Sequence, residues 1–380
     1  MTRILIIGGG IAGMATAMAA TKAGLDATVY EAHPHTDTDI GAFLTLASNG
    51  MRALAQIDAA APVARVGFDL TAMRLRDDTG AELATVPLGE HHDPLARYRC
   101  LRRAELCATL RAEAARRGST VRHGKRLATR TEDGSGITAH FTDGDTAHGD
   151  LLIGADGLNS AVRTLIDPTA PAPRYAGQRV FYGYSTEARP PHEPARIEML
   201  RGSTVAFGYT VSPGGETFWF ARVPAEELSP AQIADGTAEH WRRMLVALLR
   251  KDSTPAADIV AATGEQLMVT NARDLPAGMR WHGGRMLLIG DAAHAASPAT
   301  GQGAAMAIED AVVLAKALRD NVVMDTALRV YDRLRRPRVE RNIANSARLT
   351  AGHVPPTPQP APGQDDELLS QLDWDTPIPA

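Results

Sequence analysis

The apolar residues near the start of the chain form one short run that ends abruptly in glycine. Ile4–Ile7 is followed by Gly8-Gly9-Gly10-Ile11-Ala12-Gly13, by small residues up to Lys22, and by an apolar–polar alternation over 27–31. Such a run is too short for a buried helix, and the glycines stop it at once. The first 31 residues therefore predict a buried strand, a glycine turn, a helix and a second strand.

Two later segments repeat the pattern of a buried strand that leaves through glycine. Residues 150–153 run into Gly154-Ala155-Asp156-Gly157, and residues 285–289 run into Gly290-Asp291-Ala292-Ala293-His294. Open α/β sheets bind ligands outside the carboxyl ends of their parallel strands. We therefore expect the three glycine turns to meet around one ligand.

Elsewhere the alternation of apolar and polar positions is typical of antiparallel strands. It predicts a hairpin at 70–75 and 82–86, strands at 180–186, 195–200, 204–211 and 217–223, and one helix over 231–249. The predicted fold class is α/β, with a parallel-sheet domain of 1–68, 98–172 and 275–350. A mainly antiparallel β-sheet domain, 69–97 and 173–274, is inserted into it, and the proline-rich residues 351–380 form a loosely held C-terminal tail.

The first glycine turn has the spacing of a dinucleotide-binding site. Gly8 permits the turn, Gly10 lets a phosphate approach the backbone, and Gly13 lets the helix pack closely on the strand. The N-terminus of that helix offers unpaired N–H groups to a pyrophosphate. Glu31, at the end of the second strand, can accept hydrogen bonds from ribose hydroxyls, which favours FAD or NAD.

Composition narrows the class of protein. The chain has 380 residues, a net charge of −4 and scattered arginines, so nucleic acid is not an expected partner. Cys100 and Cys107 are the two cysteines, too few for a disulfide framework, and they fit a reducing cytoplasm. No metal site is expected, because His91 and His92 are neighbours in a solvated loop. No apolar stretch is long enough to span a bilayer.

Three boxes together carry a family resemblance. They are Gly8–Gly13 with Glu31, Gly154–Gly157 with Ser160 and Arg163, and Gly290–His294 followed by Pro298 and Gly301-Gln302-Gly303. In this order the chain resembles the single-component FAD-dependent aromatic monooxygenases of the para-hydroxybenzoate hydroxylase fold, especially the tetracycline-inactivating type. The resemblance implies a Rossmann-like FAD-binding domain with a three-layer ββα sandwich, an inserted substrate-binding sheet and a C-terminal helix.

The resemblance also implies which residues bind FAD. They are Gly8, Gly10, Ile11, Ala12, Gly13, Glu31, Gly41, Ala42, Arg103, Asp156, Asp291, Pro298, Gly301, Gln302 and Gly303. Pro298 and Gly301 would position the flavin for catalysis, and we assign no general base. His294 is expected to make a structural hydrogen bond within the Gly290–His294 box.

The implied reaction is hydroxylation of an aromatic or polycyclic small molecule, in natural-product biosynthesis, degradation or inactivation. NAD(P)H would reduce FAD, and molecular oxygen would add to give a flavin C4a-hydroperoxide. No second glycine fingerprint is visible for a nicotinamide domain, which agrees with transient docking of NAD(P)H. We expect a monomer or weak homodimer.

The inserted sheet supplies the aromatic residues that could line a substrate site. They are Tyr182, Tyr184, Phe207, Tyr209, Phe218 and Phe220. Each of them could instead be ordinary core packing. Arg196 could anchor an anionic substrate, although a solvated arginine is the simpler interpretation.

Three other functions remain open. A halogenase of the same fold would carry a Trp-x-Trp-x-Ile-Pro segment, whereas the four tryptophans here are isolated. An FAD-dependent dehydrogenase or oxidase would show no substrate-coupled oxygen insertion. A non-catalytic flavin-binding protein would never consume NAD(P)H.

Overall fold

The structure is a computed structural model that describes residues 2–34, 42–89, 92–353 and 364–380. Two residues named above, Gly41 and His91, lie outside the described residues.

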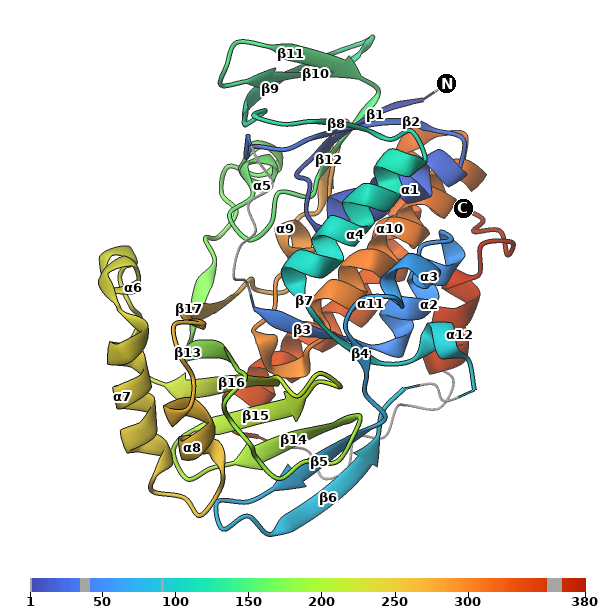
Figure 1. Ribbon diagram of the computed structural model, residues 1–380. Coiled ribbons are helices and arrows are strands. Elements are labelled where there is room, and N and C mark those ends of the chain that lie inside the picture. Colours follow the sequence, from blue (N-terminus) through green and yellow to red (C-terminus); the bar gives the residue numbers. More distant parts are fainter. Residues whose placement is uncertain (1, 35–41, 90–91, 354–363) are drawn as a thin grey trace.

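A mostly parallel sheet forms the centre of the larger half of the molecule (Figure 1). Its strands, in spatial order, are β18 (His282–Gly283), β19 (Met286–Leu288), β12 (Leu151–Gly154), β1 (Arg3–Ile7), β2 (Asp26–Tyr30) and β8 (Thr120–Arg122). β18 alone runs antiparallel to its neighbour. The three buried runs of the sequence are thus neighbouring parallel strands, as predicted.

Helices and a second sheet cover this sheet and make three layers. The helix α1 (Ile11–Lys22) packs on it and contacts α4 (Arg103–Arg116) and α10 (Gly303–Asp320). On the other face lies a sheet of β9 (Leu127–Asp133), β10 (Gly136–Phe141) and β11 (Thr146–Gly149), where the Phe141 ring stacks on Tyr30 at 4.8 Å. This arrangement confirms the ββα sandwich.

The glycine turn after β1 is set by sterics. Gly8 has φ +107°, a conformation that favours glycine. A Cβ on Gly13 would lie 1.9 Å from the carbonyl oxygen of Gly8. The close packing of α1 against the turn therefore requires glycine at both positions.

A seven-stranded sheet forms the smaller half (Figure 1). Its order is β17 (Leu267–Asp274), β13 (Arg174–Ser185), β16 (Thr217–Pro224), β15 (Ala206–Val211), β14 (Arg196–Arg201), β5 (Ala72–Arg76) and β6 (Glu82–Pro87). All neighbours are antiparallel except β14 and β5. The division into domains at the residues named above stays a prediction.

The single helix predicted over 231–249 is wrong. The structure has α6 (Pro230–Asp235) and α7 (Ala238–Leu249), and α8 (Ala256–Ala261) packs against α7. Gly236 has an extended backbone between α6 and α7. Its position requires glycine, because a Cβ there would lie 2.4 Å from the Trp241 ring. The Thr237 hydroxyl then caps α7 by accepting the His240 N–H.

A small sheet of β3 (Phe43–Leu46), β7 (Arg99–Arg102) and β4 (Phe68–Asp69) lies between the two halves, with α2 (Ser48–Gln56) and α3 (Ala60–Val63) beside it (Figure 1). Short helical segments are η1 (Pro94–Ala96), α5 (Ala161–Ile166), α9 (Asp291–His294) and η2 (Pro298–Thr300). Among the described residues, no helix is long and apolar enough to cross a membrane.

The end of the chain is docked rather than loosely held. After α11 (Met324–Thr350), the described tail contains α12 (Gln364–Leu372). Lys316 Nζ donates to the Gln371 carbonyl at 2.7 Å, and Arg319 donates to that of Trp374 at 2.7 Å. The expectation of a loose tail is therefore corrected for residues 364–380, which α10 holds in place.

Candidate flavin and substrate site

A groove of about 450 Å³ runs between the glycine turns and the seven-stranded sheet. Most residues assigned to FAD line it: Gly10, Ile11, Ala12, Ala42, Arg103, Asp291, Pro298, Gly301, Gln302 and Gly303. Gly8, Gly13, Glu31 and Asp156 do not line it. The groove therefore brings together segments that are nearly 300 residues apart in the chain.

Two helix N-termini face this groove. α1 begins after Gly10, where an added Cβ would meet nothing within 4 Å, so the space beside its backbone is open. α10 begins at Gly303, after Gly301 turns the chain with φ +65°. Unpaired N–H groups and a positive helix end at both points suit the pyrophosphate and the polar ring edge of FAD.

Glu31 is fixed at the end of β2 by backbone donors. Its Oε2 accepts the Gly9 N–H at 2.6 Å, and its Oε1 accepts the His33 N–H at 2.8 Å. The carboxylate thus lies against the glycine turn and contacts Gly9, the residue before Gly10, which lines the groove.

Asp156 serves as a helix cap in the structure. Its Oδ2 accepts the N–H groups of Ala161 and Val162 at the start of α5, at 2.8 and 3.2 Å. Burial raises the pKa of this carboxyl. Asp156 does not line the groove, whereas its neighbours Ala155 and Gly157 do, and its contact with FAD stays a prediction.

Strand alternation decides which predicted aromatic residues can meet a substrate. Tyr182 and Phe220 line the groove. Tyr184 and Phe218 share that face of the sheet but pack below Phe43, with their rings 6.2 and 5.6 Å from its ring.

Phe207 and Tyr209 lie on the opposite face of the sheet. They belong to the core shared with α7 and α8, where the Phe207 ring stacks on Trp219 at 5.6 Å. Successive side chains of a strand point to opposite faces, so these two cannot share the groove with Phe220. The prediction that they contact substrate is corrected on this ground.

Arg222 is a groove residue that the sequence analysis missed. It lies two positions after Phe220 on β16 and hence on the same face, and its guanidinium is 5.9 Å from the Phe220 ring. Its Nε and Nη1 are buried without a hydrogen-bond partner among the described residues, and burial lowers its pKa. The alternation Phe218-x-Phe220-x-Arg222 was the available signal.

The arginine considered from sequence behaves differently. Arg196 pairs with Glu193 at 2.8 Å and does not line the groove. Its interpretation as an ordinary surface arginine agrees with this position.

A buried ionic network supports the groove from behind. His294 Nε2 lies 2.5 Å from Asp310 Oδ2, which also accepts the Gly290 N–H at 2.9 Å. Arg335 donates to Asp310 Oδ1 at 2.8 Å and pairs with Glu309 at 2.8 Å. Burial opposes ionisation of Asp310, but His294 and Arg335 outweigh it and lower its pKa. His294 thus makes a structural hydrogen bond, but its partner is Asp310 of α10, which corrects the expectation of a partner within Gly290–His294.

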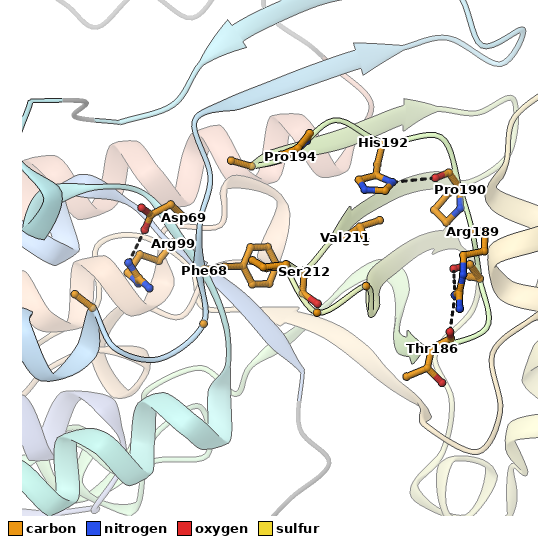
Figure 2. A pocket seen from close by; sticks show the side chains of 17 residues that line it. Phe68, Asp69, Arg99, Thr186, Arg189, Pro190, His192, Pro194, Val211 and Ser212 are labelled. Atoms are coloured by element: carbon orange, nitrogen blue, oxygen red, sulfur yellow. Dashed lines mark hydrogen bonds and ion pairs between the residues drawn. The ribbon is translucent and has the colours of Figure 1, made fainter.

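A second hollow, of about 810 Å³, lies on another side of the seven-stranded sheet (Figure 2). Figure 2 shows three of its side chains engaged with neighbours: Arg99 pairs with Asp69 at 2.5 Å, and Arg189 and His192 contact the carbonyl groups of Thr186 and Pro190. None of the residues assigned to FAD lines it. The groove, with its two helix ends and with Arg222, whose Nε and Nη1 lack a partner in the described part of the chain, is therefore the candidate site.

Comparisons with known proteins identify the family of the chain. The family model described as "FAD binding domain" matches residues 1–346. The chain is 32% identical over 374 residues to 3-amino-4-hydroxybenzoate 2-monooxygenase of Streptomyces cremeus, covering 94% of this chain and 89% of the relative.

Solved structures give the same result. Klebsiella pneumoniae HpxO, complexed with FAD and uric acid, superposes with a TM-score of 0.81 at 26% identity, over 99% of this chain and 93% of the other. The tetracycline destructase Tet(51) superposes with a TM-score of 0.69 over 100% of both chains, and at 18% identity it shows the shared fold alone. The chain belongs to the FAD-binding family of flavin-dependent monooxygenases.

Proposed function

We propose that the protein hydroxylates a small aromatic substrate that carries a negatively charged group, and that NAD(P)H supplies the electrons. The observation that carries the substrate class is Arg222, a half-buried residue beside aromatic rings in the groove, whose Nε and Nη1 are buried without a hydrogen-bond partner among the described residues. A buried charge without a partner is costly, so a site that keeps one is suited to a ligand that pairs with it. The substrate named for the Streptomyces relative is a benzoate, which has such a carboxylate.

The groove divides into a cofactor part and a substrate part. Reduced FAD would supply the two electrons that activate molecular oxygen for insertion. The N–H groups of Gly10–Ala12 would hold the pyrophosphate, and Gly301–Gly303 would hold the flavin ring edge. Pro298 would lie beside the ring, while Tyr182 and Phe220 would pack on the substrate and exclude water.

The experiment that tests this proposal compares electron supply with oxygen insertion. Purified protein with FAD is given NADH or NADPH and a panel of hydroxybenzoates, with the matching neutral benzamides. We expect nicotinamide oxidation to depend on the carboxylate-bearing phenols, with oxygen appearing in the product. Oxidation with release of hydrogen peroxide alone, whatever the aromatic compound, would indicate an oxidase instead.

Replacing Arg222 with methionine should weaken substrate binding selectively. A lost hydrogen bond to a charged group corresponds to a rise of about ten- to a hundredfold in Kd. The free energy of unfolding should not fall, because the variant no longer buries an unpaired charge. Titration of carboxylate and amide ligands against flavin absorbance measures both affinities. Arg196→Met is the matched control and should bind normally; equal weakening for both ligands would contradict the pairing.

Asp291 provides a separate test of the FAD assignment. It is the first residue of α9 and lines the groove next to the Gly290 turn. We expect Asp291→Ala to raise the Kd for FAD about tenfold through loss of a hydrogen bond to the ribityl region. Equilibrium dialysis of FAD measures the change. Asp258→Ala, which also removes an acid from the first turn of a helix, is the control; unchanged FAD binding in Asp291→Ala would rule out this contact.

A further inference from the structure

Gln302 is tied to the protein interior by a chain of side chains that do not line the groove. Asn49, in the first turn of α2, donates from Nδ2 to Gln302 Oε1 at 3.0 Å and to Glu309 Oε1 at 2.6 Å. Gln302 lines the groove immediately before α10, whereas Asn49 and Glu309 lie behind it. The contact thus runs from the groove to a fully buried carboxylate.

The carboxylate at the far end can only accept hydrogen bonds. Glu309 is 0% exposed, and Arg338 donates to both of its oxygens, at 2.8 and 2.9 Å. Arg335 pairs with the same carboxylate at 2.8 Å. Two guanidinium groups therefore keep Glu309 ionised, and an ionised carboxylate has no proton to donate.

This fixes the orientation of both amides in turn. The Asn49 atom that faces Glu309 must be the NH₂ group, because an oxygen there would face another oxygen. The same nitrogen contacts the Gln302 amide, so the Gln302 atom that faces it must be the oxygen. No hydrogen bond joins Gln302 Nε2 to another described residue. The NH₂ group is consequently the part of this amide that is available to the groove.

We propose that Asn49 and Glu309 are positioning residues that set the polarity of the Gln302 side chain, so that it presents a donor to the flavin. The inference rests on FAD occupying the groove. An N–H donor at the start of α10 has the same sign as the positive helix end beside it. The two together favour negative charge on the ring edge, which increases when the ring is reduced. An amide oxygen in the same place would disfavour this negative charge.

The test is the reduction potential of the bound flavin, measured by dye equilibration, together with FAD content and thermal stability. Asn49→Leu removes the donor and frees the Gln302 amide to rotate. We expect the equilibrium constant for flavin reduction to fall about tenfold, equivalent to a shift of about 30 mV to more negative potential. Asn321→Leu is the matched control. Asn321 also donates two hydrogen bonds, to the carbonyls of Ala317 and Ile378, but at the far end of α10.

A swapped pair separates polarity from structure. In Asn49→Asp/Glu309→Gln the acid and the amide exchange places, so the contact is kept while Gln302 must turn its NH₂ inward and its oxygen toward the flavin. We expect this variant to bind FAD and yet to keep a potential at least as negative as that of Asn49→Leu.

Recovery of the normal potential in the swapped variant would show that only the contact matters and would overturn the proposal, as would an unchanged potential in Asn49→Leu. If the unaltered protein bound no FAD, the cofactor assignment itself would fail, which the spectrum shows before any variant is made.

Discussion

Gly10→Val is expected to give a folded protein that purifies without FAD. A Cβ added to Gly10 would meet nothing within 4 Å apart from its neighbours in the chain, so the fold can accept a side chain there. That same open space is where the pyrophosphate must approach the N-terminus of α1, and valine would fill it. We expect the Kd for FAD to rise a hundredfold or more, about 3 kcal/mol. Flavin absorbance per mole of protein and thermal unfolding without added FAD measure the two effects.

Two other glycines serve as controls for this result. Gly264 also has free space around it but lies in an exposed loop, so Gly264→Val should keep both fold and FAD. Gly13→Val should fail to fold, because its Cβ would collide with the Gly8 carbonyl. Stoichiometric FAD in Gly10→Val would show that the pyrophosphate does not lie at this turn.

The architecture could be predicted from the sequence wherever a local pattern is typical of a single structure. Three apolar runs that each end in glycine became neighbouring parallel strands. From the rule that ligand sites lie at the carboxyl ends of such strands, we expected their glycine turns to meet, but the order of the strands was not predicted. The helix break at Gly236 escaped because a single glycine inside a helical pattern is often tolerated. The Trp241 ring requires glycine at this position, and that contact is not visible in the local sequence pattern.

The backbone segments that line the site could be predicted from the sequence, but most of its side-chain contacts could not. Gly10, Gly301 and Gly303 indicate by their residue type alone that a ligand can approach the backbone closely. The partners of Asn49 do not: they lie 253 and 260 positions away, and no local signal joins them. Asn49 lies in the first turn of α2, and its side chain donates a hydrogen bond to Gln302.

The substrate side shows how register limits such reasoning. Phe207 and Phe220 are equally aromatic, and both lie on strands of the same sheet. Which face each occupies depends on how β15 and β16 pair across the sheet, where Phe207 lies opposite Ala221 and Gly208 lies opposite Phe220. The alternation within each strand was visible, but the cross-strand register was not.

Arg335→Met is expected to destabilise the protein most among the single changes to the ionic network. Arg335 is 0% exposed and pairs with Glu309 and Asp310, which are also fully buried. Removing it leaves two buried carboxylates short of positive charge, a change that costs about 3–5 kcal/mol. Urea unfolding at pH 7 measures the difference. Arg329→Met, which breaks the exposed pair with Asp325 on the same helix, should change little.

The loss of unfolding free energy in Arg335→Met should also grow as the pH rises. Burial disfavours ionisation of Glu309 and Asp310, but Arg335, with Arg338 and His294, lowers their pKa values below 4.5 and 3.8. Groups with lowered pKa values stabilise the fold above those unfolded values, and this contribution is lost on acidification. Without Arg335 the two carboxyls take up protons more easily. The free energy of unfolding of the variant should therefore be close to that of the unaltered protein near pH 4, and the difference should be largest above pH 6. A difference that stayed constant across this range would mean that Arg335 acts by packing and not by charge.

Because Asp310 holds the Gly290 turn and Glu309 holds Asn49, the same variant should also lose FAD more readily at pH 7.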